Sequence, residues 1–225
     1  MARLARVVVP GLPHHVTRRG NGRQRTFFED EDYRHYRDLL GQHCSAARVA
    51  VWAWVAMPNH VHLILEPADA DGLRRALAPL HRRYAGHIHA RLKRTGHFWQ
   101  GRFGCVAMDE DHAAAALRYV LMNPVRAGLA ARAIDWPWSS ARTLLGLDAD
   151  GVTTASAVVA LWPDLAVLLE SAEDEERTLR LRRAESIGRP VGSEAWLAGL
   201  ETQRGCKLAP AKRGPKRREL SALSP

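Results

Sequence analysis

The sequence predicts an α+β protein in which an antiparallel sheet carries helices on its faces. Short runs rich in valine, tryptophan and isoleucine indicate strands, and longer stretches with apolar residues three or four positions apart indicate helices. These segments alternate as strand, helix, strand, strand, helix, strand and helix over residues 14–129. Only the turn dipeptide Pro58–Asn59 joins the two middle strands, so they are expected to form an antiparallel hairpin.

The first half of this pattern starts with a strand at residues 14–20 and a glycine-containing turn at 21–24. Residues 29–47 predict a helix, because tyrosines and leucines recur at helical spacing after an acidic start that suits a helix N-terminus. Two strands then follow at 48–57 and 60–67.

A long helix is expected from Asp71 to a stop at Gly96, with a kink or break at Pro79. Residues 98–108 predict the fourth strand, and residues 109–127 predict a last helix with acids in its first turn. The whole order is that of the ferredoxin-like split βαβ arrangement, in which both crossover helices cover one face of the sheet. The other face is left to carry chemistry or to be covered by the last helix.

The character of the chain changes after residue 147. Residues 164–186 predict a helical stretch of mixed charge, and residues 193–205 predict a short helix capped by its serine and stopped by its glycine. The last residues are rich in proline, lysine and arginine, which predicts disorder without a partner. We therefore expect one domain over residues 1–147 and a mostly helical extension with a basic tail over 148–225.

The net charge of +9 and the pI near 10.2 point to a polyanionic partner, most often nucleic acid. The alternative is a solvated basic surface, or an arginine-rich composition that reflects codon usage. Up to residue 147 basic residues outnumber acidic ones, whereas beyond it an acidic run offsets the basic tail. The first segment is thus the basic one, and the tail is a separate basic arm.

The three cysteines, Cys44, Cys105 and Cys206, lie far apart and indicate neither a disulfide framework nor a zinc site. A reducing cytosol is the expected environment. No apolar run approaches the length of a membrane span, and the apolar patch near the N-terminus is too short for a signal peptide. We expect a cytoplasmic protein associated with the nucleoid.

Two histidines interrupt the apolar strand at 60–67. Side chains two apart on a strand share a face, so His60 and His62 project together while Val61, Leu63 and Leu65 face the helices. Two neighbouring imidazoles are a natural pair of metal ligands. By themselves they are better explained as surface or packing histidines.

The last helix offers partners for this pair. Tyr119 and Asn123 are four residues apart and therefore share a helical face, where an amide oxygen can bind a metal with the phenol beside it. Pro124 should end or kink the helix and hold Asn123 in one orientation. The alternative is a core tyrosine followed by a helix stop.

The motifs "MPNHVHLIL" and, about sixty residues later, "RYVLMNPVRAGL" together resemble the single-tyrosine HUH transposases, and more closely the REP-associated tyrosine transposases. "HHVTRRGNGRQRTFF" and "HFWQGRF" are similar to the same family, and the resemblance covers roughly residues 8 to 147. It implies an endonuclease and strand transferase that cleaves and rejoins single-stranded DNA near hairpins. In this family pattern Tyr119 is the nucleophile, and His60, His62 and Asn123 are the metal ligands.

The chemistry that the resemblance implies suits these residue types. A tyrosine oxygen attacks a backbone phosphate and forms a 5′-phosphotyrosine link, which a 3′-hydroxyl can later reverse. The resemblance implies Mg²⁺ as the cofactor, with Mn²⁺ as a substitute that imidazole ligands favour. His14 and His15 have two interpretations: one of them approaches the metal or the phosphate, or both are structural, which we favour.

DNA contacts are expected from basic residues near the first turn, from the fourth-strand segment and from the tail. Trp99 could stack on an unpaired base, although such aromatics are more often core residues. The tail would add phosphate affinity without sequence information. The candidates are Arg18, Arg19, Arg23, Arg25, Trp99, Arg102, Lys212, Arg213, Lys216, Arg217 and Arg218.

Two other functions are open. One is a catalytically silent protein of the same fold that binds a DNA hairpin as a regulator. The other is a metal-dependent hydrolase that uses water as nucleophile, which has no use for a tyrosine beside the metal. The protein is expected to be a monomer or a homodimer, and the extension favours a monomer.

Overall fold

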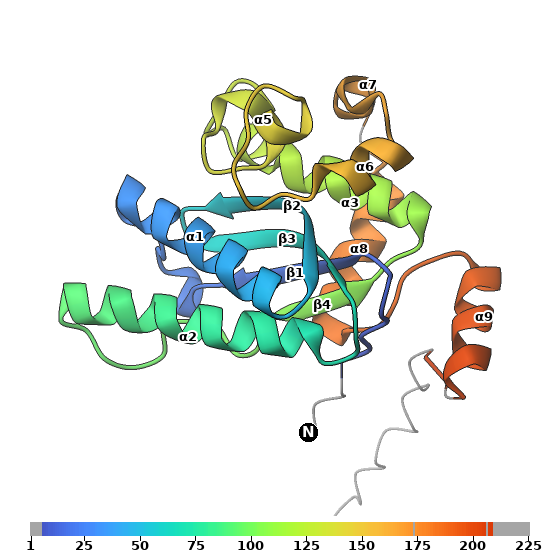
Figure 1. Cartoon of the computed structure of the whole chain (residues 1–225), viewed down its shortest axis with the longest axis horizontal. Helices are drawn as coiled ribbons and strands as arrows, with labels where there is room; N and C mark the ends of the chain where they lie inside the picture. The colour runs from blue at the N-terminus through green and yellow to red at the C-terminus, as the bar shows by residue number, and fades with distance from the viewer. Residues whose placement is uncertain (1–5, 173, 206, 209–225) are drawn as a thin grey trace, which may run out of the picture.

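The computed structural model describes residues 6–172, 174–205 and 207–208, and a four-stranded sheet lies at its centre (Figure 1). The strands lie in the order β2-β3-β1-β4, and every neighbouring pair is antiparallel. This is the strand order of the split βαβ fold, and it confirms the predicted fold class. The strands are β1 (His14–Arg19), β2 (Val49–Met57), β3 (His60–Pro67) and β4 (Gly104–Ala107).

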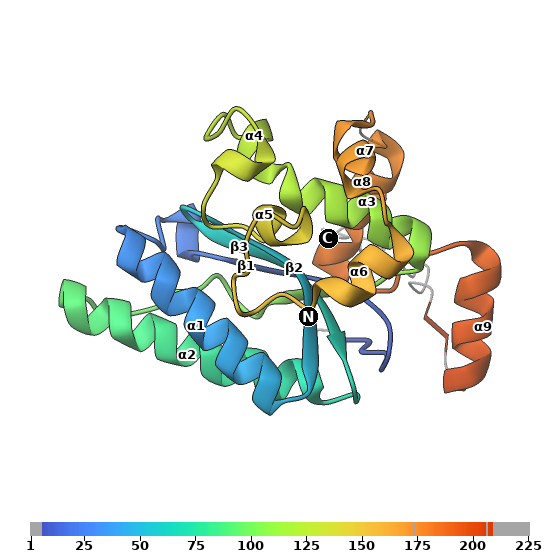
Figure 2. The ribbon, with the colours of Figure 1, turned by 45° about the horizontal axis from the view of Figure 1, so that its top comes forward.

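Two helices, α1 (Asp30–Ala46) and α2 (Gly72–Leu92), pack side by side on one face of the sheet (Figures 1 and 2). The strand residues Val61, Leu63 and Leu65 are fully buried in the core that these helices share with the sheet. The alternation of apolar residues along β3 therefore directs them to the helices, as the sequence predicted.

The opposite face is covered by α3 (Glu110–Leu121) and by α8 (Glu175–Ile187), which comes from the C-terminal extension (Figure 2). Ile64 and Val106 of the sheet share a core with Val120 of α3 and Leu181 of α8. The α3 helix starts where the Asp109 side chain accepts a hydrogen bond from the His112 amide, and it carries the acids expected in its first turn.

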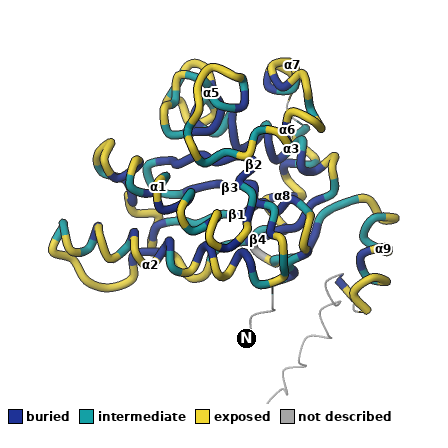
Figure 3. Tube along the Cα trace, viewed as in Figure 1, coloured by how far each residue is buried: buried dark blue, intermediate teal, exposed yellow. Residues whose placement is uncertain are grey.

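The remaining elements form the connections and the rest of the extension, and most of their exposed residues lie away from the sheet (Figure 3). They are η1 (Asn21–Arg23), α4 (Asn123–Arg126), η2 (Ala133–Asp135), α5 (Ala141–Leu144), α6 (Ala155–Leu161), α7 (Leu165–Glu170) and α9 (Glu194–Arg204). The α9 helix has the predicted limits, because Ser193 caps it and Gly205 ends it with φ of +62°. In the described part of the chain, no helix is long and apolar enough to cross a membrane.

Several elements differ from the sequence prediction. The last helix, α3, ends at Leu121 instead of residue 127, and the stretch 164–186 forms two helices, α7 and α8. The fourth strand starts at Gly104 instead of residue 98, because Phe98 and Trp99 turn into the α1–α2 core. The α2 helix ends at Leu92, because Lys93 adopts the left-handed conformation with φ of +51° before Gly96 is reached. Pro79 does not break α2, because the helix buries its inner face against the sheet on both sides of it.

His14 is fully buried in β1 as a neutral ring with both nitrogens bonded. Its Nδ1 donates to the Leu12 carbonyl at 2.7 Å, and its Nε2 accepts the Val9 amide at 3.1 Å. Burial lowers the pKa of His14 to about 4. Protonation of Nε2 would place a second N–H against the Val9 N–H, so the folded protein excludes the charged form.

Acidification should therefore destabilise the fold through His14. Because its folded pKa lies below the ordinary value of 6.5, the unfolded chain takes up the proton first, and stability is lost between about pH 6.5 and about pH 4. The contribution is about 3 kcal/mol. Urea unfolding across this range should show a shallower pH dependence in His14→Gln than in the wild type, and equal slopes would contradict the assignment.

Candidate functional site

The predicted histidine pair and Tyr119 meet where β3 faces α3. His60 and His62 project from the same side of the strand, with ring centroids 4.9 Å apart. The Tyr119 ring stands at 89° to the His62 ring with centroids 5.3 Å apart, and Tyr119 is 8% exposed. A strand period of two and a helix packed across it thus bring together three of the four residues predicted for the site.

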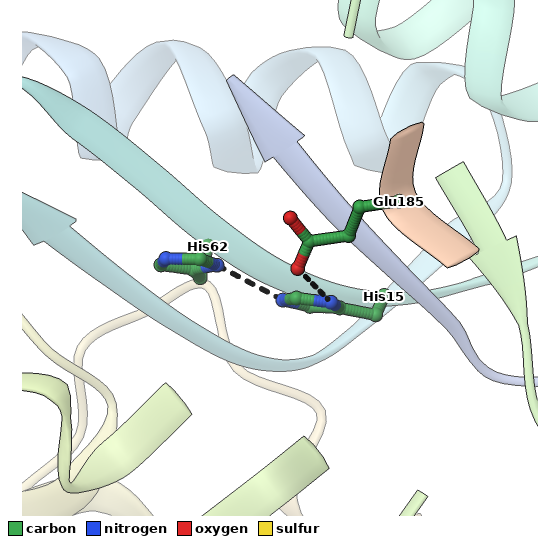
Figure 4. Close-up of side chains that lie close together, drawn as sticks. All are labelled: His15, His62 and Glu185. Carbon is green, nitrogen blue, oxygen red and sulfur yellow. Dashed lines mark hydrogen bonds and ion pairs between the residues drawn. The ribbon is translucent and has the colours of Figure 1, made fainter. Parts of the chain in front are cut away.

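His62 is held by a chain of polar side chains from two other elements (Figure 4). Its Nδ1 lies 3.0 Å from Nε2 of His15 on β1, and the two rings are within 6° of parallel. Nδ1 of His15 lies 3.2 Å from Oε1 of Glu185 on α8. Nε2 of His62 is buried and has no hydrogen-bond partner among the described residues.

His60 is oriented by its neighbour in the turn. The Asn59 amide nitrogen donates to the Arg23 carbonyl at 3.1 Å, which turns its oxygen towards His60 Nδ1 at 2.5 Å. Since that oxygen can only accept, Nδ1 of His60 carries the proton and Nε2 keeps a free lone pair.

Both imidazoles are neutral at physiological pH. Burial, and then the charge of Arg19, lower the pKa of His60 to about 4. Burial, followed by the nearby His15, lowers the pKa of His62 well below its ordinary value. A neutral imidazole is the form that binds a metal ion, so the site keeps two ligand nitrogens available.

Asn123 follows the break that Pro124 was expected to cause. The α3 helix ends at Leu121, and Asn123 is the first residue of the short helix α4. Its backbone carbonyl accepts the Ala127 amide at 3.0 Å, and the residue is half-buried. No hydrogen bond joins its side chain to either histidine within the described residues.

Two arginines lie over the Tyr119 ring. The guanidinium carbon of Arg126 is 4.8 Å from the ring centroid, and that of Arg182 on α8 is 5.1 Å from it. They place positive charge beside the phenol, an arrangement that suits an anionic group.

A cleft of about 710 Å³ opens beside this site, and Arg182 and Glu185 of α8 form part of its wall. Arg6, Arg19 and Arg102 also line it. A second cleft, of about 470 Å³, lies on the other side and is lined by Arg23, Arg25, Asn59 and His60, among others. Because Arg19 of the first cleft pairs with His60 of the second in the β1–β3 register, the two clefts adjoin at the histidine pair.

The five arginines predicted to contact DNA in the described part of the chain divide between the two clefts and the opposite face of the sheet. Arg19, Arg23, Arg25 and Arg102 line the two clefts. Arg18 points to the opposite face, where it donates to the Gly101 carbonyl at 2.5 Å, and burial lowers its pKa to about 10.

Trp99 lies in the core instead of on a surface that an unpaired base can reach. It is 7% exposed, and its indole N–H donates to the His81 carbonyl at 2.9 Å. The five tail residues lie outside the described residues, namely Lys212, Arg213, Lys216, Arg217 and Arg218.

Sequence reasoning missed Arg182 and Glu185, and it favoured a structural role for His15. His15 and His62 lie on different strands, and the β1–β3 register, which pairs His15 with Ile64, places them on one face of the sheet. For Arg182 and Glu185 the signal is weak: they are three residues apart and therefore share a helix face in a segment of mixed charge. Nothing in that segment indicates that the face meets β1 and β3.

The residues present fit a divalent metal ion. Nε2 of His60 and Nε2 of His62 both keep lone pairs, and the latter is buried with no hydrogen-bond partner in the part of the chain that the structure describes. His15, His62 and Glu185 also offer donor atoms within 4.8 Å of one another. In that trio, however, Nε2 of His15 already bonds Nδ1 of His62, while Nδ1 of His15 lies 3.2 Å from Glu185 without hydrogen-bond geometry.

The sequence profile described as "Transposase IS200 like" matches residues 9–123. A solved structure titled as the REP-associated tyrosine transposase bound to a REP hairpin aligns over 70% of this chain and 96% of its own, with 22% identity and a TM-score of 0.53. A putative transposase from Deinococcus radiodurans R1 aligns over 53% of this chain and 95% of its own, with 21% identity and a TM-score of 0.39. No curated protein matches the sequence.

The solved structure with the REP hairpin shows that the fold is shared, and the sequence profile shows the family. The profile match spans all four strands and helices α1 to α3, and it includes His60, His62, Tyr119 and Asn123. This confirms the resemblance that the two motifs predicted: the chain belongs to the IS200-like transposase family.

Proposed function

We propose that the protein is a DNA endonuclease and strand transferase that uses Tyr119 as its nucleophile on single-stranded DNA near hairpins, such as REP-like palindromes. The observation that carries the proposal is the arrangement of Tyr119 between a pair of neutral histidines and two guanidinium groups. The histidine pair suits a metal ion, and the two guanidinium groups suit a phosphate.

The reaction follows from these groups. The Tyr119 oxygen forms a bond to a backbone phosphorus as its own proton leaves, and the bond from phosphorus to the 3′ oxygen breaks. The strand then carries a 5′-phosphotyrosine, and the released 3′ oxygen takes up a proton. Attack of a 3′-hydroxyl on the phosphotyrosine reverses the step, and the retained ester makes an external energy source unnecessary.

His60 and His62 would hold a divalent ion through their Nε2 atoms, with the Asn123 amide oxygen as the third protein ligand. When bound, Mg²⁺, or Mn²⁺ in its place, would polarise the scissile phosphate and offset the charge that develops on it. Arg126 and Arg182 would bind the non-bridging phosphate oxygens beside Tyr119. The histidine tautomers and the burial of the site prepare it for this role.

The two clefts supply a path for the DNA on either side of the scissile phosphate. Arg19 and Arg102 line one cleft, and Arg23 and Arg25 line the other, so a strand laid across the histidine pair meets basic residues in both directions. The basic tail would add further phosphate contacts. We propose a cytoplasmic, nucleoid-associated protein that works as a monomer, with a homodimer as the alternative.

The alternative function is a silent regulator of the same fold that binds a DNA hairpin without cutting it. A labelled single-stranded hairpin incubated with the protein and Mg²⁺ or Mn²⁺ separates the two on a denaturing gel. A covalent adduct supports the enzyme, and binding without cleavage under either ion supports the regulator. Cleavage without any adduct would instead indicate a hydrolase that uses water.

Arg182→Ala should weaken both DNA binding and cleavage. Loss of one phosphate contact should reduce the slope of log affinity against log salt by about 0.7. Single-turnover cleavage should fall about 100-fold, the order expected when one charged transition-state donor is removed. Arg180→Ala is the matched control, since Arg180 is exposed on the same helix and pairs with Glu176. Equal effects of the two variants would place Arg182 outside the phosphate site.

A further inference from the structure

We propose that Glu185 is a positioning residue that acts through His15 to fix the tautomer of His62, so that Nε2 of His62 presents its lone pair to the metal ion. The inference rests on the proposed function, in which His62 is a metal ligand. It gives a helix of the C-terminal extension a defined task in the catalytic centre.

The three side chains come from α8, β1 and β3, and the Glu185 carboxylate stands above the His15 ring, which lies beside the ring of His62 (Figure 4). Oε1 of Glu185 lies 3.2 Å from His15 Nδ1, and His15 Nε2 lies 3.0 Å from His62 Nδ1. The two rings are nearly parallel, with centroids 5.1 Å apart, and with this short nitrogen–nitrogen distance they meet edge to edge. His15 is completely buried, and among the described residues only its Nε2 has a hydrogen-bond partner, whereas Nδ1 lies beside the Glu185 carboxylate without one.

The chemistry of the three groups gives the chain one direction. Nδ1 of His15 and Oε1 of Glu185 lie 3.2 Å apart without hydrogen-bond geometry, so the carboxylate acts through its negative charge, which favours the ring proton on Nδ1. With a single ring proton there, Nε2 of His15 is the acceptor in its bond to His62, and Nδ1 of His62 must be the donor. This leaves Nε2 of His62 without a proton, and that is the buried atom with no partner among the described residues.

The opposite direction would be costly. If His62 carried its proton on Nε2, its Nδ1 lone pair would need a proton from Nε2 of His15. With its single proton on Nε2, the His15 ring would then place the lone pair of Nδ1 3.2 Å from the negative charge of Glu185, which is electrostatically unfavourable. The carboxylate therefore decides the tautomer two residues away.

Packing holds Glu185 in this position. Leu181 and Ala184, which precede Arg182 and Glu185 by one residue each, are buried in the core shared with α3 and the sheet. The next positions on α8 therefore face the site, with the Glu185 side chain 22% exposed along the cleft wall. Asn59 does the same for His60 from within the turn, so each histidine has its own orienting partner.

The test measures the tautomer directly in metal-free protein. Long-range ¹H–¹⁵N NMR of histidine-labelled protein separates protonated from unprotonated ring nitrogens, and a His62→Asn variant assigns the His62 signals among the 11 histidines. We expect Nδ1 of His62 to be protonated and Nε2 to be unprotonated in the wild type. In Glu185→Ala, the Nε2–H form should appear.

The same variants are then titrated with Mn²⁺ and followed by electron paramagnetic resonance. Glu185→Ala should raise the Mn²⁺ dissociation constant about 10–100-fold, the usual cost of losing an orienting partner. Glu175→Ala, a glutamate exposed in the first turn of the same helix, should leave it unchanged.

An Nε2–H tautomer in the wild type would overturn the proposal, and this spectrum needs no variant to fold. An unchanged tautomer and Mn²⁺ affinity in folded Glu185→Ala would overturn it as well. Failure of the proposed function looks different: His62→Ala would then bind Mn²⁺ as tightly as the wild type, whatever tautomer the NMR spectrum shows.

Discussion

Tyr119→Phe should abolish the covalent protein–DNA adduct and reduce strand cleavage by roughly 10⁶-fold, the order seen when a catalytic nucleophile is removed. Phenylalanine keeps the ring that contacts His62, Arg126 and Arg182, so the fold and hairpin binding should be retained. The measurement is a denaturing gel of protein incubated with a labelled hairpin substrate and Mn²⁺, with a binding assay on the same samples.

Tyr33→Phe is the matched control. Tyr33 is buried in the core between the sheet and the α1 and α2 helices, on the face opposite the site, where its ring stacks on Phe27 and Trp138. This variant should form the adduct as the wild type does. An adduct that persists in Tyr119→Phe would assign the nucleophile to another residue, and cleavage that persists without an adduct would indicate attack by water.

His62→Ala, or removal of divalent ions by a chelator, should reduce cleavage by roughly 10³-fold while hairpin binding persists. A bound ion supplies several kcal/mol of stabilisation to the charge that develops on the phosphate, and this corresponds to a loss of that order. Single-turnover cleavage before and after addition of Mg²⁺ or Mn²⁺ is the measurement. Added ion should restore the chelated wild type and leave His62→Ala inactive.

His87→Ala provides the comparison, because His87 is exposed on α2 and packs only against His35 in the described contacts. It should cleave and bind Mn²⁺ like the wild type. Full activity of the wild type in chelator would remove the metal from the mechanism. Full activity of His62→Ala with ion present would remove His62 from the ligand set but leave the role of Tyr119 intact.

The order of elements, and the face of β3 that carries His60 and His62, follow directly from the sequence. Strand periodicity separates His60 and His62 from Val61, Leu63 and Leu65, and Pro124 indicates where α3 has to end. Local rules were enough here, because residues two apart on a strand, or next to a proline, influence each other through the backbone alone.

Local rules fail where two environments use the same residue types. Trp99 was open to either core packing or base stacking, and the structure places it under α2 with its indole bonded to the His81 carbonyl. Arg18 and Arg19 are equally basic in the sequence, but the strand period sends one to the α2 face and the other to the cleft beside His60.

The α+β order, the histidine pair and the tyrosine four residues before an asparagine can all be recognised in the sequence. The position of α8 over the sheet, and the contacts of Arg182 with Tyr119 and of Glu185 with His15, are known only from the folded chain. More than 160 residues separate His15 from Glu185, so no backbone rule links them. Their contact exists because Leu181 and Ala184 bury their side chains against α3 and the sheet. This packing orients α8 so that Arg182 and Glu185 point towards the site.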